Sequence, residues 1–191
     1  MLIAFEGSRM PKTKKNIISA MRDLLEKKPF VKITVNDICA TADIGRSTFY
    51  LHFDDKFALT RFLFNETRAY LNSLLPGKAL PDRLEGILDC FREDRKFNAN
   101  LLSSSAKPLY IESLTRNFYE DYIELLTDYE EKGHPLPAAP ELIATFYASG
   151  LANTLIWWME TGYPVPAAEL ADCHNALTHG RLPLVKQSGN W

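Results

Sequence analysis

The stretch IGRSTFYLHFDDK, residues 44–56, decides the fold of this 191-residue chain. It sets the aromatic residues Phe49, Tyr50 and Phe53 among short polar and basic side chains, over about two turns of helix. The segment is too short, and too polar on one side, to be a core helix. We therefore expect Phe49 and Phe53 to pack inward and the polar side chains to form an exposed face.

A second short helix is predicted directly before this stretch, over residues 34–42. Thr34 is a suitable N-cap, and Asp37 completes a capping box in which Asp replaces the usual Glu or Gln. A three-residue turn then leads into a helix over 46–53. Two short helices joined by so tight a turn have the dimensions of a helix-turn-helix unit, and an amphipathic helix over 13–28 can pack beneath them.

The rest of the chain also has helical periodicity and no convincing strand alternation. Prolines and glycines separate the predicted segments, most clearly in the linker KGHPLPAAP at 132–140. The predicted fold class is all-α, with about nine helices. The further helices are expected at 54–75 (with Asp54 as its N-cap), 82–94, 97–105, 108–131, 140–161 and 166–179.

The helix predicted over 140–161 has two apolar stripes instead of one. One stripe contains Phe146, Tyr147 and Trp158, and the other contains Leu142 and Trp157. A helix that is apolar on two sides is expected to be buried on two sides.

Charge is distributed unevenly along the chain, although its net value is only −2. Residues 1–53 carry nine Lys/Arg against five Asp/Glu, a net charge of +4, and the remainder is acidic. Such asymmetry indicates that the basic part meets an anionic partner.

The three cysteines, Cys39, Cys90 and Cys173, are far apart and lack the spacing of a zinc site or a disulfide framework. We expect no metal and no cofactor. No apolar run approaches the length of a membrane span, so a cytoplasmic protein is predicted. Residues 1–9 are expected to be disordered.

Catalysis is the first alternative to consider. The sequence contains no Gly-rich phosphate loop, no G-x-S-x-G and no HExxH motif, so we do not expect an enzyme.

Nucleic-acid chemistry fits the exposed face of the 46–53 helix better. The first turns of a recognition helix approach base edges in the major groove, where Arg46 can make a bidentate contact and Thr48 can meet a thymine methyl. Phosphate contacts set the position of the protein on the duplex and require donors around this face. Arg46, Ser47 and Thr48 are expected to contact bases, and Thr34, Tyr50, His52 and Lys56 to contact phosphates.

The segment TVNDICATADIGRSTFYLHFDDKFAL, residues 34–59, resembles the DNA-binding signature of TetR-family transcriptional regulators. Two positions depart from that signature: Asp43 replaces the Gly favoured in the turn, and Gly45 replaces a common Ser, which removes a hydroxyl. The matching residues are Thr34, Ile38, Ala42, Ile44, Thr48, Tyr50, His52, Phe53, Lys56 and Leu59.

The resemblance implies a homodimer that binds a palindromic DNA operator, with a DNA-binding domain over 10–56 and a ligand-binding and dimerisation domain over 57–191. It also implies that the last two helices, 140–161 and 166–179, form the dimer interface. The segment FYASGLANTLIWWMETGYP, residues 146–164, resembles a subgroup linked to dihydroxyacetone-kinase operons.

The family further implies a small-molecule effector and a role as a repressor. An activator, or an adaptor that acts through a protein partner, remains the alternative. Seven aromatic side chains, several with polar tips, and one threonine are candidates for the lining of an effector pocket, and plain core packing is the alternative for each. These candidates are Phe62, Thr67, Tyr70, Tyr119, Tyr122, Phe146, Tyr147 and Trp158.

Overall fold

The computed structural model describes residues 10–74, 79–103 and 105–178, and every regular element in these ranges is a helix, as predicted. Residues 1–9, for which disorder is predicted, lie outside the described residues. The elements are α1 Lys12–Leu25, the 3₁₀ helix η1 Phe30–Lys32, α2 Val35–Ala42, α3 Arg46–Tyr50, α4 Lys56–Leu74, α5 Leu80–Glu93, α6 Arg95–Leu102, α7 Lys107–Glu131, α8 Pro140–Glu160 and α9 Ala167–Thr178.

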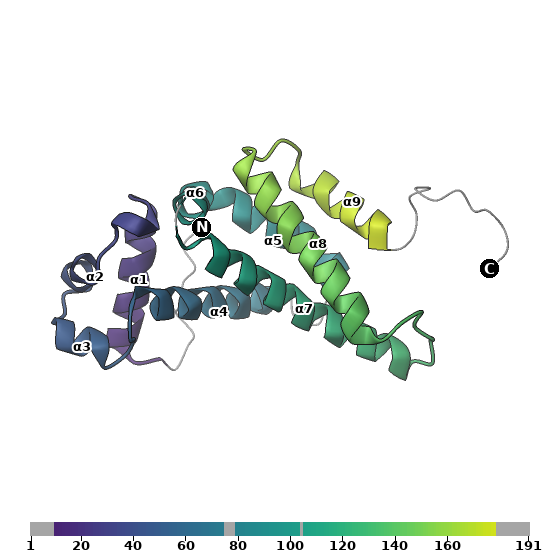
Figure 1. Ribbon diagram of the computed structural model, residues 1–191, viewed down its shortest axis with the longest axis horizontal. Coiled ribbons are helices and arrows are strands. Elements are labelled where there is room, and N and C mark those ends of the chain that lie inside the picture. Colours follow the sequence, from purple (N-terminus) through teal and green to yellow (C-terminus); the bar gives the residue numbers. More distant parts are fainter. Residues whose placement is uncertain (1–9, 75–78, 104, 179–191) are drawn as a thin grey trace.

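Helices α1 to α3 form a small unit at one end of the molecule, and α4 leads from it into the bundle of α5 to α9 (Figure 1). The apolar centre of this unit is continuous with the core of the bundle, and α1, α2 and α3 each turn one face into it. Phe49 is fully buried there and Phe53 nearly so, which confirms the inward packing expected of both. Ile17, Ile18, Met21, Leu25 and Ile38 complete this centre.

The capping box at the start of α2 and the turn between α2 and α3 both form as predicted. The Thr34 hydroxyl accepts from the Asp37 main-chain N–H at 3.1 Å, and the Asp37 carboxylate accepts from the Thr34 main-chain N–H at 2.8 Å, which completes the capping box. Asp43 has a left-handed backbone with φ of 53°, a conformation that Asp tolerates better than most residues. Gly45 is the N-cap of α3 and, without a side chain, makes no side-chain hydrogen bond there.

Several helix ends differ from the predicted ones. Helix α1 ends at Leu25, because the chain tightens into a turn before Pro29 and then forms η1, which the apolar pattern did not reveal. Helix α4 begins at Lys56 and is capped by Asp55, not by Asp54. The Asp55 carboxylate accepts from the Ala58 main-chain N–H at 2.6 Å.

The bundle is built around α7 and α8, which make the most extensive contact between any two helices, while α9 packs on α5. A tight turn with positive φ at Gly162 and Tyr163 joins α8 to α9. The Trp158 indole N–H donates to the Val165 carbonyl at 2.8 Å across this turn. The turn therefore holds the start of α9 against the end of α8.

Within the described chain, helix α8 does not bury its predicted apolar stripes as units, because Phe146 and Trp158 belong to the same predicted stripe and differ in exposure. Ala148, Leu151 and Trp158 are buried, whereas Phe146 is 74% exposed and Leu142 and Trp157 are also exposed. The expectation of burial on two sides is therefore not met within a single chain.

Candidate functional site

Helix α3 exposes the polar face that the sequence predicts. Arg46, Ser47 and Tyr50 are exposed, and Thr48 is half-buried beside them. The Arg46 guanidinium donates to the Tyr50 hydroxyl at 3.4 Å, and its central carbon lies 5.9 Å from the centre of the Tyr50 ring. The two residues are four positions apart, so they share one side of the helix.

Two of the expected phosphate contacts already take part in hydrogen bonds within the chain. The Thr34 hydroxyl both donates to and accepts from Asp37. The Lys56 ammonium donates to the main-chain carbonyls of Phe30 at 3.0 Å and Ile33 at 2.8 Å, and it lies 4.3 Å from the centre of the Phe30 ring. Partial burial lowers the pKa of Lys56. Lys56 therefore holds the η1 loop, which leads into Thr34, against the start of α4.

Helical spacing predicts that Leu51 faces outward or sideways, but the sequence offers no reason to assign it a contact. It directly follows α3 and is 83% exposed, beside Tyr50 and the half-buried His52. An apolar side chain at this position can meet a thymine methyl group in the major groove. The sequence indicates this exposure, because Leu51 lies between Tyr50 and His52 and cannot turn inward together with Phe49 and Phe53.

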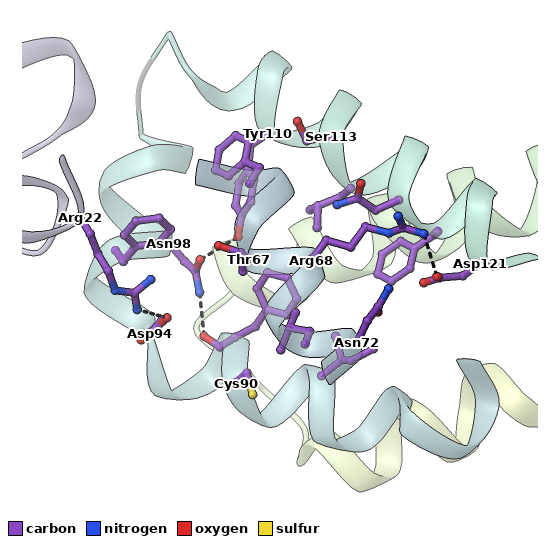
Figure 2. A pocket seen from close by; sticks show the side chains of 18 residues that line it. Arg22, Thr67, Arg68, Asn72, Cys90, Asp94, Asn98, Tyr110, Ser113 and Asp121 are labelled. Carbon is purple, nitrogen blue, oxygen red and sulfur yellow. Dashed lines mark hydrogen bonds and ion pairs between the residues drawn. The ribbon is translucent and has the colours of Figure 1, made fainter. Parts of the chain in front are cut away.

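The second candidate site is a pocket between α4, α5, α6 and α7 (Figure 2). It encloses about 810 Å³ of atom-free space, its open mouth included. The centre of a water-sized sphere can move through about 70 Å³ of this space. Phe64, Leu71, Phe91, Phe97 and Phe118 are among the apolar side chains that line it.

Charged side chains lie at opposite ends of this pocket (Figure 2). At one end, Arg22 of α1 forms an ion pair with Asp94 at 2.5 Å, and both side chains are largely buried. At the other end, Arg68 of α4 donates to Asp121 of α7 at 3.1 Å. The first pair joins the α1–α3 unit directly to the bundle.

Polar groups between these ends are partly used in internal hydrogen bonds. The Tyr110 hydroxyl donates to the Asn98 side-chain oxygen at 2.8 Å, and the Asn98 amide donates to the Phe91 carbonyl at 2.7 Å. Complete burial raises the pKa of Tyr110 far above its usual range, and partial burial raises that of the Cys90 thiol. Both groups are therefore neutral near pH 7.

None of the seven aromatic residues expected to line a pocket lines this one, although Thr67 does. Phe62 packs against Phe53, with ring centres 5.6 Å apart, and Tyr70 and Tyr119 are half-buried. Tyr122 is buried and shares a hydrogen bond with His174, while Tyr147 lies 5.7 Å from its ring centre. Phe146 is exposed on α8, and Trp158 is fully buried in the core.

The pocket residues left a different signal in the sequence. Ser113, Asn117 and Asp121 lie at i, i+4 and i+8 in the helix predicted over 108–131, so they form a polar stripe on one side of it. All three line the pocket. A polar stripe next to the buried residues Leu114, Phe118 and Tyr122 was therefore a better guide than aromatic side chains.

Two further properties bear on function. Within residues 10–74, 79–103 and 105–178, no three side chains of the metal-binding types gather closely enough to hold an ion. No helix in the same ranges combines the length and the apolar character that crossing a membrane requires.

Two family models match the chain. Residues 17–61 match the bacterial regulatory proteins of the tetR family, and residues 78–180 match a transcriptional regulator C-terminal region. A comparison with curated proteins gives no match.

Solved structures agree with these matches. A TetR transcriptional regulator from Streptococcus agalactiae is 26% identical with a TM-score of 0.67, and the match covers 87% of this chain and 93% of that one. The dihydroxyacetone kinase operon activator DhaS is 20% identical with a TM-score of 0.67, over 88% and 95%. The repressor FadR from Thermus thermophilus, solved in complex with lauroyl-CoA, is 17% identical with a TM-score of 0.63, over 93% and 99%.

The likeness to DhaS shows a shared fold, and the subgroup suggested by residues 146–164 stays a prediction. The family models together cover the α1–α3 unit from residue 17 onward and the bundle of α5 to α9, and they describe regulators and not enzymes. This chain belongs to the TetR family of DNA-binding transcriptional regulators.

Proposed function

We propose that this regulator is a ligand-responsive repressor that binds a palindromic operator as a homodimer. Residues 10–56 form the DNA-binding domain, and residues 57–191 bind the effector and dimerise. Arg46, Ser47 and Thr48 contact bases. Thr34, Tyr50, His52 and Lys56 contact phosphates, and Lys56 has one N–H left for this after its two bonds to main-chain carbonyls.

The exposed apolar side of α8 supports the homodimer. Leu142, Phe146 and Trp157 are large, exposed and on the same helix. Exposed apolar groups at successive helical positions are typical of a surface that another chain covers. In a two-fold dimer the same surface of each subunit meets its mate.

The observation that carries the ligand response is that Arg22 lines the pocket although it belongs to α1. Its ion pair with Asp94 is one link between the DNA-binding domain and the bundle. A second link runs from the Asn100 side-chain amide on α6 to the Leu25 carbonyl at the end of α1, at 2.7 Å. A ligand that fills the pocket therefore lies against one of the groups that set the position of α1.

Such a ligand can change DNA binding only if it has different affinities for two positions of α1. The proposed order of events is that the ligand prefers a position in which the two α3 helices of the dimer no longer match the operator. The operator then dissociates and transcription resumes.

Selection of bound DNA tests this function. Genomic fragments retained by the full-length protein would be sequenced and footprinted. We expect two inverted half-sites whose centres are separated by about 34–36 Å or a multiple of it. A reporter gene placed behind the selected site should be expressed less when the protein is present.

A single asymmetric site, or no preferred DNA, would contradict the palindromic operator. Increased reporter expression would favour an activator instead.

A further inference from the structure

The pocket has two chemically different walls. The α5 and α6 side is mainly apolar and includes Ile87, Phe91 and Phe97. The α4 and α7 side carries polar groups, and it includes Thr67, Arg68, Ser113, Asn117 and Asp121. A ligand that fits both walls is amphipathic.

Two arginines and two carboxylates form a cluster at the polar wall, and only one of these carboxylates, that of Asp121, is buried. Arg68 and Arg83 both donate to Asp121, at 3.1 and 2.7 Å, so two guanidinium groups share one carboxylate. The side chains of Arg83 and Asp121 are 7% and 6% exposed. The other acidic partner of Arg68 is Glu120, whose side chain is 49% exposed, and water weakens that attraction.

At the opposite end of the pocket, Arg22 is paired with Asp94. Each of the two carboxylates that line the pocket, Asp94 and Asp121, therefore already faces at least one arginine. A cationic ligand would therefore have to compete with an arginine for either carboxylate. An anionic oxygen group could accept from the Nε–H of Arg68.

Hydrogen-bond donors are also available on this wall. The Nε–H of Arg68 is buried and has no hydrogen-bond partner in the described structure. Ser113 is 1% exposed, lines the pocket, and makes no side-chain hydrogen bond within the described ranges. A buried donor without a partner is costly, so a ligand that accepts from it gains affinity.

We propose that the effector is a small apolar molecule that carries one carboxylate or similar anionic oxygen group. The anionic oxygens accept from the Arg68 guanidinium, Ser113 offers a further donor, and the apolar body lies against Phe91 and Phe97. This inference rests on the proposed role of the pocket as the effector site. It adds the chemical class of the effector and the residue that selects it.

Matched compounds with one carbon skeleton test the inference. The probes are 4-phenylbutyrate, 4-phenylbutan-1-ol and 4-phenylbutylamine, together with decanoate, decan-1-ol and decylamine. Their binding to the full-length protein would be measured by calorimetry and by the shift in melting temperature. We expect at least one acid to bind about tenfold or more tightly than its alcohol and its amine.

Arg68→Met should remove this preference, because it lowers the affinity for the acid and leaves the affinity for the alcohol unchanged. Arg61→Met is the matched control, since Arg61 is an exposed arginine on the same helix and does not line the pocket. The acid preference should survive in that variant. Equal losses in both variants would overturn the role of Arg68.

The comparison on the unmodified protein decides the class of effector even if the Arg68 variant does not fold. The inference is overturned if an alcohol or an amine binds as tightly as its acid, or if no compound in the series binds. Binding of the ligand-free protein to its selected operator is measured separately. Loss of DNA binding with the acid preference intact would reject the proposed function alone, and the reverse result would reject this inference alone.

Discussion

Lys56 shows how one residue can serve the fold and the partner together. Its ammonium holds the Phe30 and Ile33 carbonyls, yet these neutral groups do not cancel its charge. The spacing of the family signature places a lysine here but does not show that the lysine also fastens the loop before α2. That role depends on where η1 lies, and the sequence did not reveal η1.

Lys56→Met should therefore change two quantities. The free energy of unfolding should fall by about 1–2 kcal/mol, because the Ile33 carbonyl loses its Lys56 donor and the Phe30 carbonyl keeps only the Ile33 main-chain N–H. The slope of log affinity against log salt concentration should fall by about 0.9 for each subunit of the bound dimer, because each subunit loses one phosphate contact. Denaturant unfolding and operator binding at several salt concentrations measure them. An unchanged salt slope would leave Lys56 with the positioning role only.

Arg46, unlike Lys56, does not hold another part of the fold in place. It is exposed, and its only described side-chain partner is Tyr50, four residues later. Arg46→Ala should weaken operator binding by about 1–3 kcal/mol and relax the base preference at one position of each half-site. Binding to a set of operators with single base changes measures both effects. Arg92→Ala, at an exposed arginine on α5, is the control. A uniform loss across all operators would exclude base reading by Arg46.

At the scale of the element, the N-terminus of α2 depends on Asp37. The Thr34 main-chain N–H is the main cause that lowers the pKa of Asp37, and the Lys28 ammonium 3.0 Å away contributes as well. The pKa of Asp37 falls from 3.8 to about 2. As pH falls between these two values, the Asp37 carboxylate of the unfolded chain binds a proton before that of the folded chain does. Acid therefore removes the stability that the ionised carboxylate gives to the folded state.

Asp37→Asn should make the protein less stable near neutral pH, and the difference from the unmodified protein should shrink as pH falls from about 4 to about 2. Denaturant unfolding over this pH range measures the difference. Asp23→Asn, at an exposed carboxylate on α1, should leave the pH dependence unchanged. A constant difference across the range would show that the carboxylate charge does not stabilise α2.

The elements also show which parts of the fold local sequence can predict. The α2 cap and the turn at Asp43 follow from side chains within a few residues of each other, and both form as expected. The choice between Asp54 and Asp55 as the α4 cap depends on the backbone path out of α3, where the chain continues in a turn after Tyr50. No pattern in the sequence specifies that path.

At the scale of the whole molecule, the pocket was the hardest part to predict. Its polar wall combines residues from α4 and α7, and its link to α1 joins Arg22 to Asp94, 72 residues apart. The aromatic residues in the sequence indicate which positions carry large apolar side chains. They do not indicate whether such a side chain faces a cavity, the core or solvent. Trp158 and Phe146 have opposite exposures although they lie on the same helix.

The proposed dimer gives the prediction that belongs to this scale. Phe146→Asp should leave the fold of the subunit intact, because the side chain is 74% exposed, and should convert the dimer into a monomer. A charge placed in an apolar interface costs desolvation energy in both subunits. Light scattering measures the mass, and operator binding should weaken with it.

Tyr129→Asp is the control for this variant, because Tyr129 is another exposed aromatic residue but lies near the end of α7. It should remain dimeric. A Phe146→Asp protein that stays dimeric would place the interface elsewhere.

The links between α1 and α6 limit how freely the parts of this regulator can be exchanged. A chimera that joins residues 10–56 to the bundle of a relative would separate Arg22 from Asp94, and the Leu25 carbonyl from Asn100. The transplanted DNA-binding domain would then keep its DNA preference but would lack both of these contacts with the bundle of the relative. A responsive chimera therefore needs an acidic residue and an amide donor at the equivalent places on the recipient's sixth helix and the turn before it.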